Sequence, residues 1–291
     1  MSTSGMALWK QGMGFACVSV LLAACGQNHS ATSASTPASE ASKAEAASGK
    51  VLTVGSDMTF PPYEYMENNE PKGVDIELMN AIAKNIGYSV KWEDTRWANL
   101  IPGLDGKKFD VLFSSMYITK ERLQKVDMIP YYKTDESLLV TADATFAPKG
   151  PGDLCGHTVG TMKGTAFVTQ LQTVSKETCV AAGKGAITIR EYETSPQVTQ
   201  AVLAKAVEVQ YDDAAVMKAA VKKLGDKVKI TSTESFFPVV GGIAIRKGDS
   251  DMRQKLEDGL KKAEASGEYK ALLDQYGLSI PTQADIDAVM K

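Results

Sequence analysis

Arg122 lies three residues after Thr119 in the run SSMYITKER, residues 114–122, where a cation is unexpected. The run is typical of a strand end followed by the first turn of a helix, with Thr119 as the cap. A helix start carries exposed N–H groups and a partial positive charge, so it favours anions. A guanidinium beside Ser114 and Ser115 is suited to binding a carboxylate. The simpler alternative is that Arg122 pairs with a nearby Asp or Glu.

Aromatic and acidic side chains follow other predicted strands. Ligands of open α/β sheets bind beyond the carboxyl ends of the strands, so residues at these positions are candidates for a cleft. Phe60 and Trp97 could hold the flat or aliphatic part of a ligand, with cation–π attraction of about 1 to 2 kcal/mol if that part is charged. Asp57 could neutralise such a charge. The alternatives are that the aromatics complete a core and that Asp57 ends a strand by bonding its own backbone.

Two stretches of the second half supply further polar groups. In MKGTAF, residues 162–167, Gly164 allows close backbone approach and Thr165 offers a helix cap and a hydroxyl group. Asp212 ends the strand-like run VEVQYDD, residues 207–213, and could accept a hydrogen bond from an ammonium group. A helix N-cap would look the same in sequence.

These residues are spaced by an alternation of strands and helices. Runs of this kind predict a mainly parallel sheet covered on both faces, hence an α/β fold. The pattern is interrupted near FAPKGPGDLCG and then restarts, which indicates two α/β units. The predicted strands are 51–57, 88–95, 109–115, 136–143, 157–165, 186–193, 207–213, 228–234 and 241–249, and the predicted helices are 74–87, 98–106, a segment from about 119, 165–182, 195–206, 212–224 and two more through 278.

The N-terminal segment has the layout of an export signal. One Lys precedes a short apolar run, and Leu22-Ala23-Ala24-Cys25 resembles the bacterial lipoprotein signal. We therefore predict a signal peptide at 1–24 and lipidation of Cys25, the alternatives being ordinary cleavage after Ala-x-Ala or an uncleaved anchor. Residues 25–49 are rich in Ser, Ala and Thr, which predicts a flexible tether. The folded part would lie in the cell envelope, in the periplasm or on the outer face of the membrane.

Two cysteines remain in the folded part, Cys155 and Cys179. Leftover thiols of an exported protein usually pair, so we predict a disulfide, with a redox or metal site as the alternatives. The formal net charge of −3 with scattered signs predicts no nucleic-acid partner and no docking on anionic lipid. We expect no cofactor, no metal and a monomeric protein.

Three blocks of the sequence carry a resemblance to a known family. They are residues 54–87, 100–122 and 207–213, and they resemble the polar amino-acid-binding proteins of bacterial ABC importers, family 3 of the solute-binding proteins. The resemblance implies the two-lobe periplasmic-binding-protein fold of type II, with the ligand between the lobes. Lobe 1 would contain residues 50–140 and 238–291, and lobe 2 would contain residues 141–237, with crossing strands near Leu139–Ala142 and Phe236–Val240.

The resemblance also implies roles for the candidate residues. Arg122 would bind the α-carboxylate of an amino acid with help from Ser115 and Thr165, and Asp212 would bind the α-ammonium. Asp57, Phe60 and Trp97 would face the ligand side chain. Tyr117 and Phe167 stand where relatives often have small or polar residues. The full set of predicted ligand-binding residues is Asp57, Phe60, Trp97, Ser114, Ser115, Tyr117, Arg122, Met162, Thr165, Phe167 and Asp212.

The function implied is that of the binding component of an amino-acid importer, which delivers its ligand to an inner-membrane ABC permease. Asp57 between two aromatic walls favours a cationic ligand such as Arg, Lys, ornithine or His, although glutamine, cystine or a modified amino acid stays open. A dehydratase-like enzyme on the same fold could use Asp57, Glu64, Asp212 or Asp213, but the sequence carries no recognisable catalytic motif. A ligand-sensing partner of a receptor and a structural lipoprotein are further alternatives.

Overall fold

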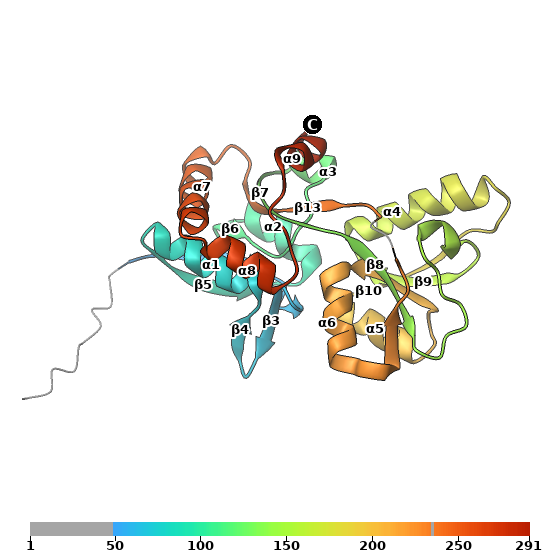
Figure 1. Cartoon of the computed structure of the whole chain (residues 1–291). Coiled ribbons are helices and arrows are strands. Elements are labelled where there is room, and N and C mark those ends of the chain that lie inside the picture. Colours follow the sequence, from blue (N-terminus) through green and yellow to red (C-terminus); the bar gives the residue numbers. More distant parts are fainter. Residues whose placement is uncertain (1–48, 234–235) are drawn as a thin grey trace, which may run out of the picture. The chain divides into compact units, whose positions relative to one another are not determined.

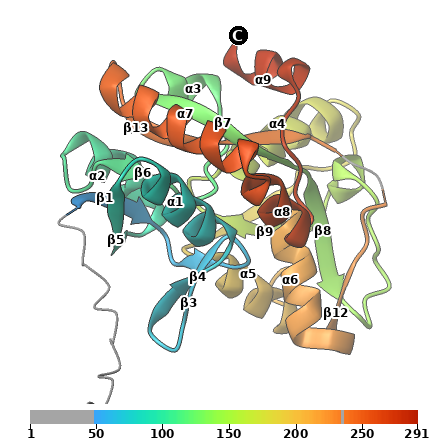
Figure 2. The ribbon, with the colours of Figure 1, turned by 60° about the vertical axis from the view of Figure 1, so that its left-hand side comes forward.

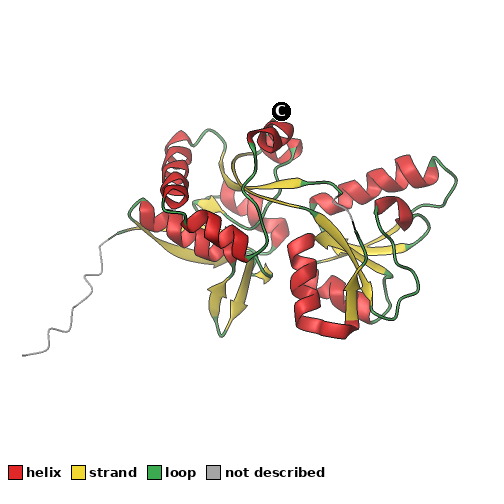
Figure 3. Ribbon diagram, in the orientation of Figure 1, coloured by secondary structure: helices red, strands yellow, loops and turns green. Residues whose placement is uncertain are grey.

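Two five-stranded sheets organise the protein. The computed structural model describes residues 49–233 and 236–291. The predicted signal peptide, Cys25 and nearly all of the predicted tether lie outside the described residues. Figure 1 and Figure 3 show the two sheets, each with its own helices, which we name the first and second lobe.

The sheet of the first lobe has the order β5-β1-β6-β13-β7. β1 is parallel to both β5 and β6, while β13 is antiparallel to β6 and β7. The next two strands of this sheet along the chain, β5 and β6, lie on either side of β1, so residues after β1 and β6 meet at a topological switch point. The strands are β1 (Lys50–Ser56), β5 (Tyr88–Asp94), β6 (Val111–Leu112), β7 (Val126–Thr134) and β13 (Val239–Arg246).

The sheet of the second lobe repeats this plan with the order β10-β9-β11-β8-β12. β9 lies between parallel β10 and β11, and β8 is antiparallel to β11 and β12. Residues after β9 and β11 therefore meet at a second switch point. The strands are β8 (Glu136–Thr141), β9 (Thr158–Met162), β10 (Thr188–Tyr192), β11 (Val209–Asp213) and β12 (Val228–Ile230).

Helices pack against both sheets because each has an apolar face. α1 packs against β5, α7 and α8, whereas α2 packs against β1 and β6, as Figure 2 shows from the side. In the second lobe α5 contacts β9 and β10, and α6 contacts β8 and β12. The helices are α1 (Val74–Asn85), α2 (Leu100–Asp105), α3 (Lys120–Leu123), α4 (Ala166–Val174), α5 (Ser195–Leu203), α6 (Ala214–Leu224), α7 (Ser250–Ala265), α8 (Glu268–Gln275) and α9 (Gln283–Met290), with shorter turns η1 (Trp97–Asn99), η2 (Pro151–Leu154), η3 (Ser175–Val180) and η4 (Gly225–Lys227).

The chain passes twice between the lobes. The first passage is at Asp135, the residue that separates β7 in the first sheet from β8 in the second. The boundary predicted after residue 140 is therefore too late, because the whole of β8 pairs with strands of the second sheet. The second passage is the connection from β12 to β13, which contains the predicted boundary at 237/238.

Several elements were absent from the sequence-based prediction. The strand β7 contains Pro130, which argues against a central strand, and β7 is indeed an edge strand whose Pro130 pairs with Gly242 where the register shifts. The short sheet of β2 (Thr59–Phe60), β3 (Glu64–Glu67) and β4 (Glu70–Lys72) is mostly polar. Within the described residues no helix is long and apolar enough to cross a membrane.

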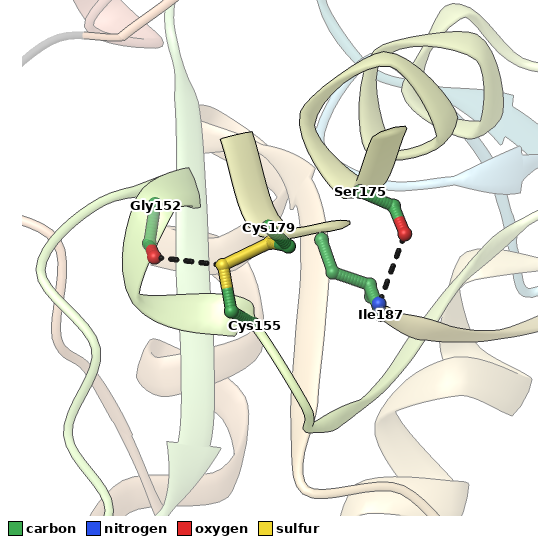
Figure 4. The surroundings of a disulfide bond; sticks show 5 residues. All are labelled: Gly152, Cys155, Ser175, Cys179 and Ile187. Atoms are coloured by element: carbon green, nitrogen blue, oxygen red, sulfur yellow. Dashed lines mark hydrogen bonds between the residues drawn. A yellow bond between two sulfur atoms is a disulfide. The ribbon is translucent and has the colours of Figure 1, made fainter. Parts of the chain in front are cut away.

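The predicted disulfide joins Cys155 to Cys179 in the second lobe. Figure 4 shows that it connects the turn η2 to the segment η3, which continues α4. Ser175 Oγ accepts a hydrogen bond of 3.0 Å from the backbone N–H of Ile187 beside it. The disulfide thus holds the C-terminal end of α4, whose N-terminal end follows Thr165.

We predict that removing this disulfide lowers stability without abolishing the fold. The bond closes a sequence separation of 24 residues, which corresponds to about 3 kcal/mol in the chain-entropy model and to a melting temperature lower by roughly 5 to 12 °C. Thermal melts of the Cys155→Ala/Cys179→Ala variant and of the wild type with and without reductant measure this. The variant is the control for reductant effects, and an unchanged wild-type melt after complete reduction would contradict the prediction.

Candidate ligand-binding site

A cavity with a volume of about 20 Å³ lies where the loops after the two switch points face each other. This volume holds about one water molecule, so an amino acid can enter only if the side chains around the cavity move apart. It is bounded by residues of both lobes, so a ligand within it would contact both. From the first lobe the lining residues are Phe60, Trp97, Ser115, Tyr117 and Arg122, and from the second lobe they are Met162, Thr165, Ala166 and Phe167.

Arg122 is the one charged residue among those lining residues. Its Nη1 donates a 2.8 Å hydrogen bond to the backbone oxygen of Tyr117, and its guanidinium lies 5.2 Å from the centre of the Trp97 ring. Among the described residues, no carboxylate forms an ion pair with Arg122. Burial lowers the pKa of Arg122 to about 10, although the nearby charge of Glu121 opposes this fall. A guanidinium has five N–H donors, so most of its capacity remains for a ligand.

The helix that carries Arg122 is shorter than expected. Thr119 caps it as predicted, with its Oγ1 accepting a 3.2 Å hydrogen bond from the Arg122 N–H. However, α3 extends only over Lys120–Leu123. A single turn has few aligned peptide dipoles, so the helix start contributes little to anion binding and the guanidinium itself is the anion-binding group.

Ser115 is held in a strained backbone conformation at the cavity wall. Its φ angle is 42°, which non-glycine residues rarely adopt. Three contacts fix it: its N–H donates to Asp75 Oδ2 at 2.7 Å, its carbonyl oxygen accepts from Tyr132 OH at 2.8 Å, and its Oγ donates to Glu64 Oε1 at 3.3 Å. Strained residues that are held this firmly are typical of functional sites.

Two carboxyl groups are buried beneath Ser115. Burial raises the pKa of Glu64 well above its usual value, with the neighbouring charge of Asp75 as the next cause, and burial also raises the pKa of Asp75. Tyr131 OH donates to both oxygens of Asp75 at 2.8 Å. Neither acid lines the cavity; both support the strained serine above them.

Aromatic rings connect the two lobes across the cavity. Tyr117 meets Phe167 edge to face, with 5.6 Å between ring centroids. Trp97 Nε1 donates a 2.9 Å hydrogen bond to the Gly164 oxygen, so the indole of the first lobe reaches the backbone of the second. Gly164 has φ = 69°, which favours glycine there. These contacts hold the lobes together at the mouth of the cavity.

A larger open groove continues from the cavity. The two share Trp97, Arg122, Thr165 and Ala166. Since Arg122 and Trp97 stand at their junction, the groove is a direct route by which a small molecule can reach the guanidinium.

Asp57 and Ser114 do not line the cavity, contrary to prediction. Asp57 is fully buried and accepts from Arg96, Thr59 and Trp97: Arg96 Nη1 lies 2.8 Å from Oδ1, Thr59 Oγ1 also 2.8 Å from Oδ1, and the Trp97 N–H 2.8 Å from Oδ2. Burial raises the pKa of Asp57, and these partners oppose the rise. Ser114 Oγ donates to Glu64 at 2.8 Å and accepts from the Asp57 N–H. Both residues support the wall rather than face the cavity.

Asp212 does not line the cavity, and neither does its neighbour Asp213, which contacts the first lobe instead. Asp212 Oδ2 accepts from Ser195 Oγ at 2.6 Å and from Gln210 Nε2 at 3.0 Å inside the second lobe. Asp213 instead accepts across the lobes, from Tyr117 OH at 2.7 Å and from Tyr63 OH at 3.1 Å. Asp213 also caps α6. Successive strand residues face opposite sides, so Asp213 rather than Asp212 contacts the first lobe. That Asp212 binds the ligand ammonium stays a prediction.

Two further acids of the second lobe, Glu136 and Asp212, are buried. Burial raises the pKa of Asp212 to about 7 and that of Glu136 to about 8. Glu136 is bound by Tyr211 OH and by Gln170 Nε2, contacts that oppose the rise. Within the described part of the chain no group of His, Cys, Asp and Glu has the arrangement of a metal site.

These raised pKa values predict that the protein loses stability as the pH rises. Between about pH 4 and about pH 8 the folded state keeps protons on Asp212 and Glu136 that the unfolded chain releases, so the stability they contribute is full at low pH and is lost as pH passes through about 7 to 8. Melting temperatures from about pH 5 to about pH 9 measure the slope. Glu136→Gln mimics the protonated acid and should flatten it, whereas an unchanged slope would contradict the assignment.

The sequence matches the bacterial extracellular solute-binding proteins, family 3, over residues 52–279. The L-cystine-binding protein TcyJ of Escherichia coli K12 is 26% identical over 77% of this chain and 82% of its own length. The arginine-binding extracellular protein ArtP of Bacillus subtilis 168 is 29% identical over 88% of this chain and 92% of its own length.

A solved structure agrees with these sequence matches. The ancestral amino acid-binding protein AncCDT-1, described as a precursor of cyclohexadienyl dehydratase, superposes with a TM-score of 0.68 at 30% identity, over 78% of this chain and 95% of that one. The predicted two-lobe fold of type II is thereby confirmed.

Proposed function

Because the chain belongs to the bacterial extracellular solute-binding proteins, family 3, we propose that it captures a free amino acid between its lobes and delivers it to the permease of an ABC importer. The observation that carries the proposal is the guanidinium of Arg122, which faces the cavity without an acidic partner among the described residues. A half-buried cation of this kind is stabilised by an anionic ligand, and a carboxylate matches its planar donor geometry.

The α-ammonium of the ligand is assigned to Asp213. Its carboxylate is bound by the hydroxyl group of Tyr117, which itself lines the cavity. A modest rotation of Tyr117 would bring a ligand ammonium into the place of that hydroxyl. Arg122 belongs to the first lobe and Asp213 to the second, so a zwitterion bound to both favours the closed arrangement of the lobes.

We further propose that the protein binds its ligand without converting it. None of the residues that line the cavity is a carboxylate or a histidine, so a general acid or base for the dehydratase reaction is missing from that surface. Of the buried acids behind the wall, Asp57 is bound to Arg96 and Asp213 to two tyrosine hydroxyls. Glu64 accepts from Ser115 through Oε1, while its Oε2 has no hydrogen-bond partner among the described residues. The curated relatives reported above are likewise named as binding proteins.

The remaining parts of the proposal concern location and partners. We place the protein in the cell envelope as a monomer, anchored through lipid on Cys25, with the folded part in the periplasm or on the outer face of the membrane. The features that support this are the sequence Leu22-Ala23-Ala24-Cys25 and a family of extracellular proteins. Metabolic labelling with a fatty acid, lost in Cys25→Ala, would test the anchor.

Arg122→Ala should abolish amino-acid binding while leaving the fold intact. Burial disfavours the charge of the guanidinium and no carboxylate in the described part of the chain pairs with it, so its removal should not lower the melting temperature measured without added ligand. Calorimetric titration and thermal melts with the common amino acids, on protein refolded to remove carried-over ligand, measure both effects. We expect a loss in affinity of about 100-fold or more. Arg253→Ala, which removes an arginine paired with Glu257 on α7, is the matched control.

A comparison of Asp213→Asn with Asp212→Asn tests the ammonium site. Asparagine is a good helix N-cap, so the variant at 213 should keep α6 and the fold. Its affinity for amino acids should fall by about tenfold or more, because the ammonium loses a charged partner. The variant at 212 should bind nearly as the wild type does. A larger loss at 212 than at 213 would restore the assignment made from the sequence.

A further inference from the structure

Arg96 forms an ion pair with Asp57, the carboxylate that was predicted to bind a cationic ligand side chain. Its Nη1 lies 2.8 Å from Asp57 Oδ1, and its Nη2 is bound to Asp94 on the solvent side. The side chain of Arg96 is 38% exposed while that of Asp57 is 1% exposed. The guanidinium of Arg96 thus reaches inward from the surface and pairs with the buried Asp57 behind Phe60 and Trp97.

The other oxygen of Asp57 is engaged as well. The backbone N–H of Trp97 donates to Oδ2, and Thr59 Oγ1 shares Oδ1 with Arg96. Each donor comes from an element next to the cavity, since Phe60 and Trp97 line it. Asp57 therefore helps to position Phe60 and Trp97. Its charge is neutralised by Arg96, which does not line the cavity.

The charges that remain at the cavity are unsuited to a cationic side chain. Its lining residues include one positive charge, that of Arg122, and none that is negative. The face of Trp97, which could attract a cation, already holds Arg122 at 5.2 Å. An ammonium or guanidinium on the ligand side chain would be desolvated beside Arg122, where the cavity wall offers it no carboxylate; Asp105, Glu121 and Glu191 line only the groove outside, and Asp213 is needed by the α-ammonium.

We propose that Arg96 determines the specificity of this pocket, so that the ligand is an amino acid with an uncharged, largely apolar side chain. This rests on the proposed function, because it assumes that Arg122 and Asp213 bind the α-groups. The side chain would then contact Phe60, Met162 and Phe167. Aromatic rings and a thioether favour aliphatic, aromatic or sulfur-containing groups.

The first test compares ligand classes on the wild-type protein, refolded to remove carried-over ligand. Titration calorimetry is performed with arginine, lysine and ornithine, and with leucine, methionine, phenylalanine, glutamine and cystine. Binding of an uncharged ligand at least about tenfold tighter than any cationic one supports the proposal. Tighter binding of a cationic ligand overturns it but leaves the proposed function standing. Binding of no amino acid at all overturns the proposed function and this inference with it.

The second test removes the neutralising charge. Arg96→Gln leaves Asp57 with Thr59 and the Trp97 N–H but without a cation, so cationic ligands should gain about tenfold or more in affinity. The gain should disappear in Arg96→Gln/Asp57→Asn and should be absent in Arg96→Lys, which keeps the charge. Lys108→Gln is the matched control, because Lys108 binds Thr95 nearby and does not contact Asp57. Melts verify the fold of each variant; a folded Arg96→Gln protein without the gain overturns the assignment of Arg96.

Discussion

The binding site is built around a guanidinium that forms no ion pair with any carboxylate of residues 49–233 and 236–291. Arg122 is oriented by the backbone oxygen of Tyr117 and by the ring of Trp97, neither of which neutralises it. Burial lowers its pKa to about 10, so an anion bound beside it would be favourable. The strained Ser115, the aromatic side chains and residues of the second lobe surround this cation.

Acidic residues surround the cavity but are kept out of it. Asp57 is paired with Arg96, Asp75 holds the Ser115 N–H, and Asp213 receives two tyrosine hydroxyls. Each of these contacts satisfies a buried carboxylate that would otherwise be costly. As a result, Arg122 is the one charged side chain among the residues that line the cavity.

Much of this could be predicted from the sequence, because residues that follow strands in α/β sheets gather at one edge. Phe60, Trp97, Arg122 and Thr165 were found in this way, and they line the cavity. The acids could not be assigned by the same rule. The partner of a carboxylate depends on residues distant in sequence or outside the recognised motifs. The pairing of Arg96 with Asp57 could not be predicted, because an arginine before a tryptophan is an ordinary surface pattern. In the strand β11 the acids Asp212 and Asp213 are adjacent, so only the exact end of the strand tells which one faces the other lobe.

The contacts between the lobes affect how long the lobes stay closed around a ligand. Trp97 donates a hydrogen bond to Gly164, and Tyr63 and Tyr117 donate to Asp213. A small molecule can move along the open groove that adjoins the cavity, whereas separation of the lobes requires these three side chains to release their partners. The time for which the lobes stay together therefore depends on these hydrogen bonds as well as on the contacts of the ligand itself.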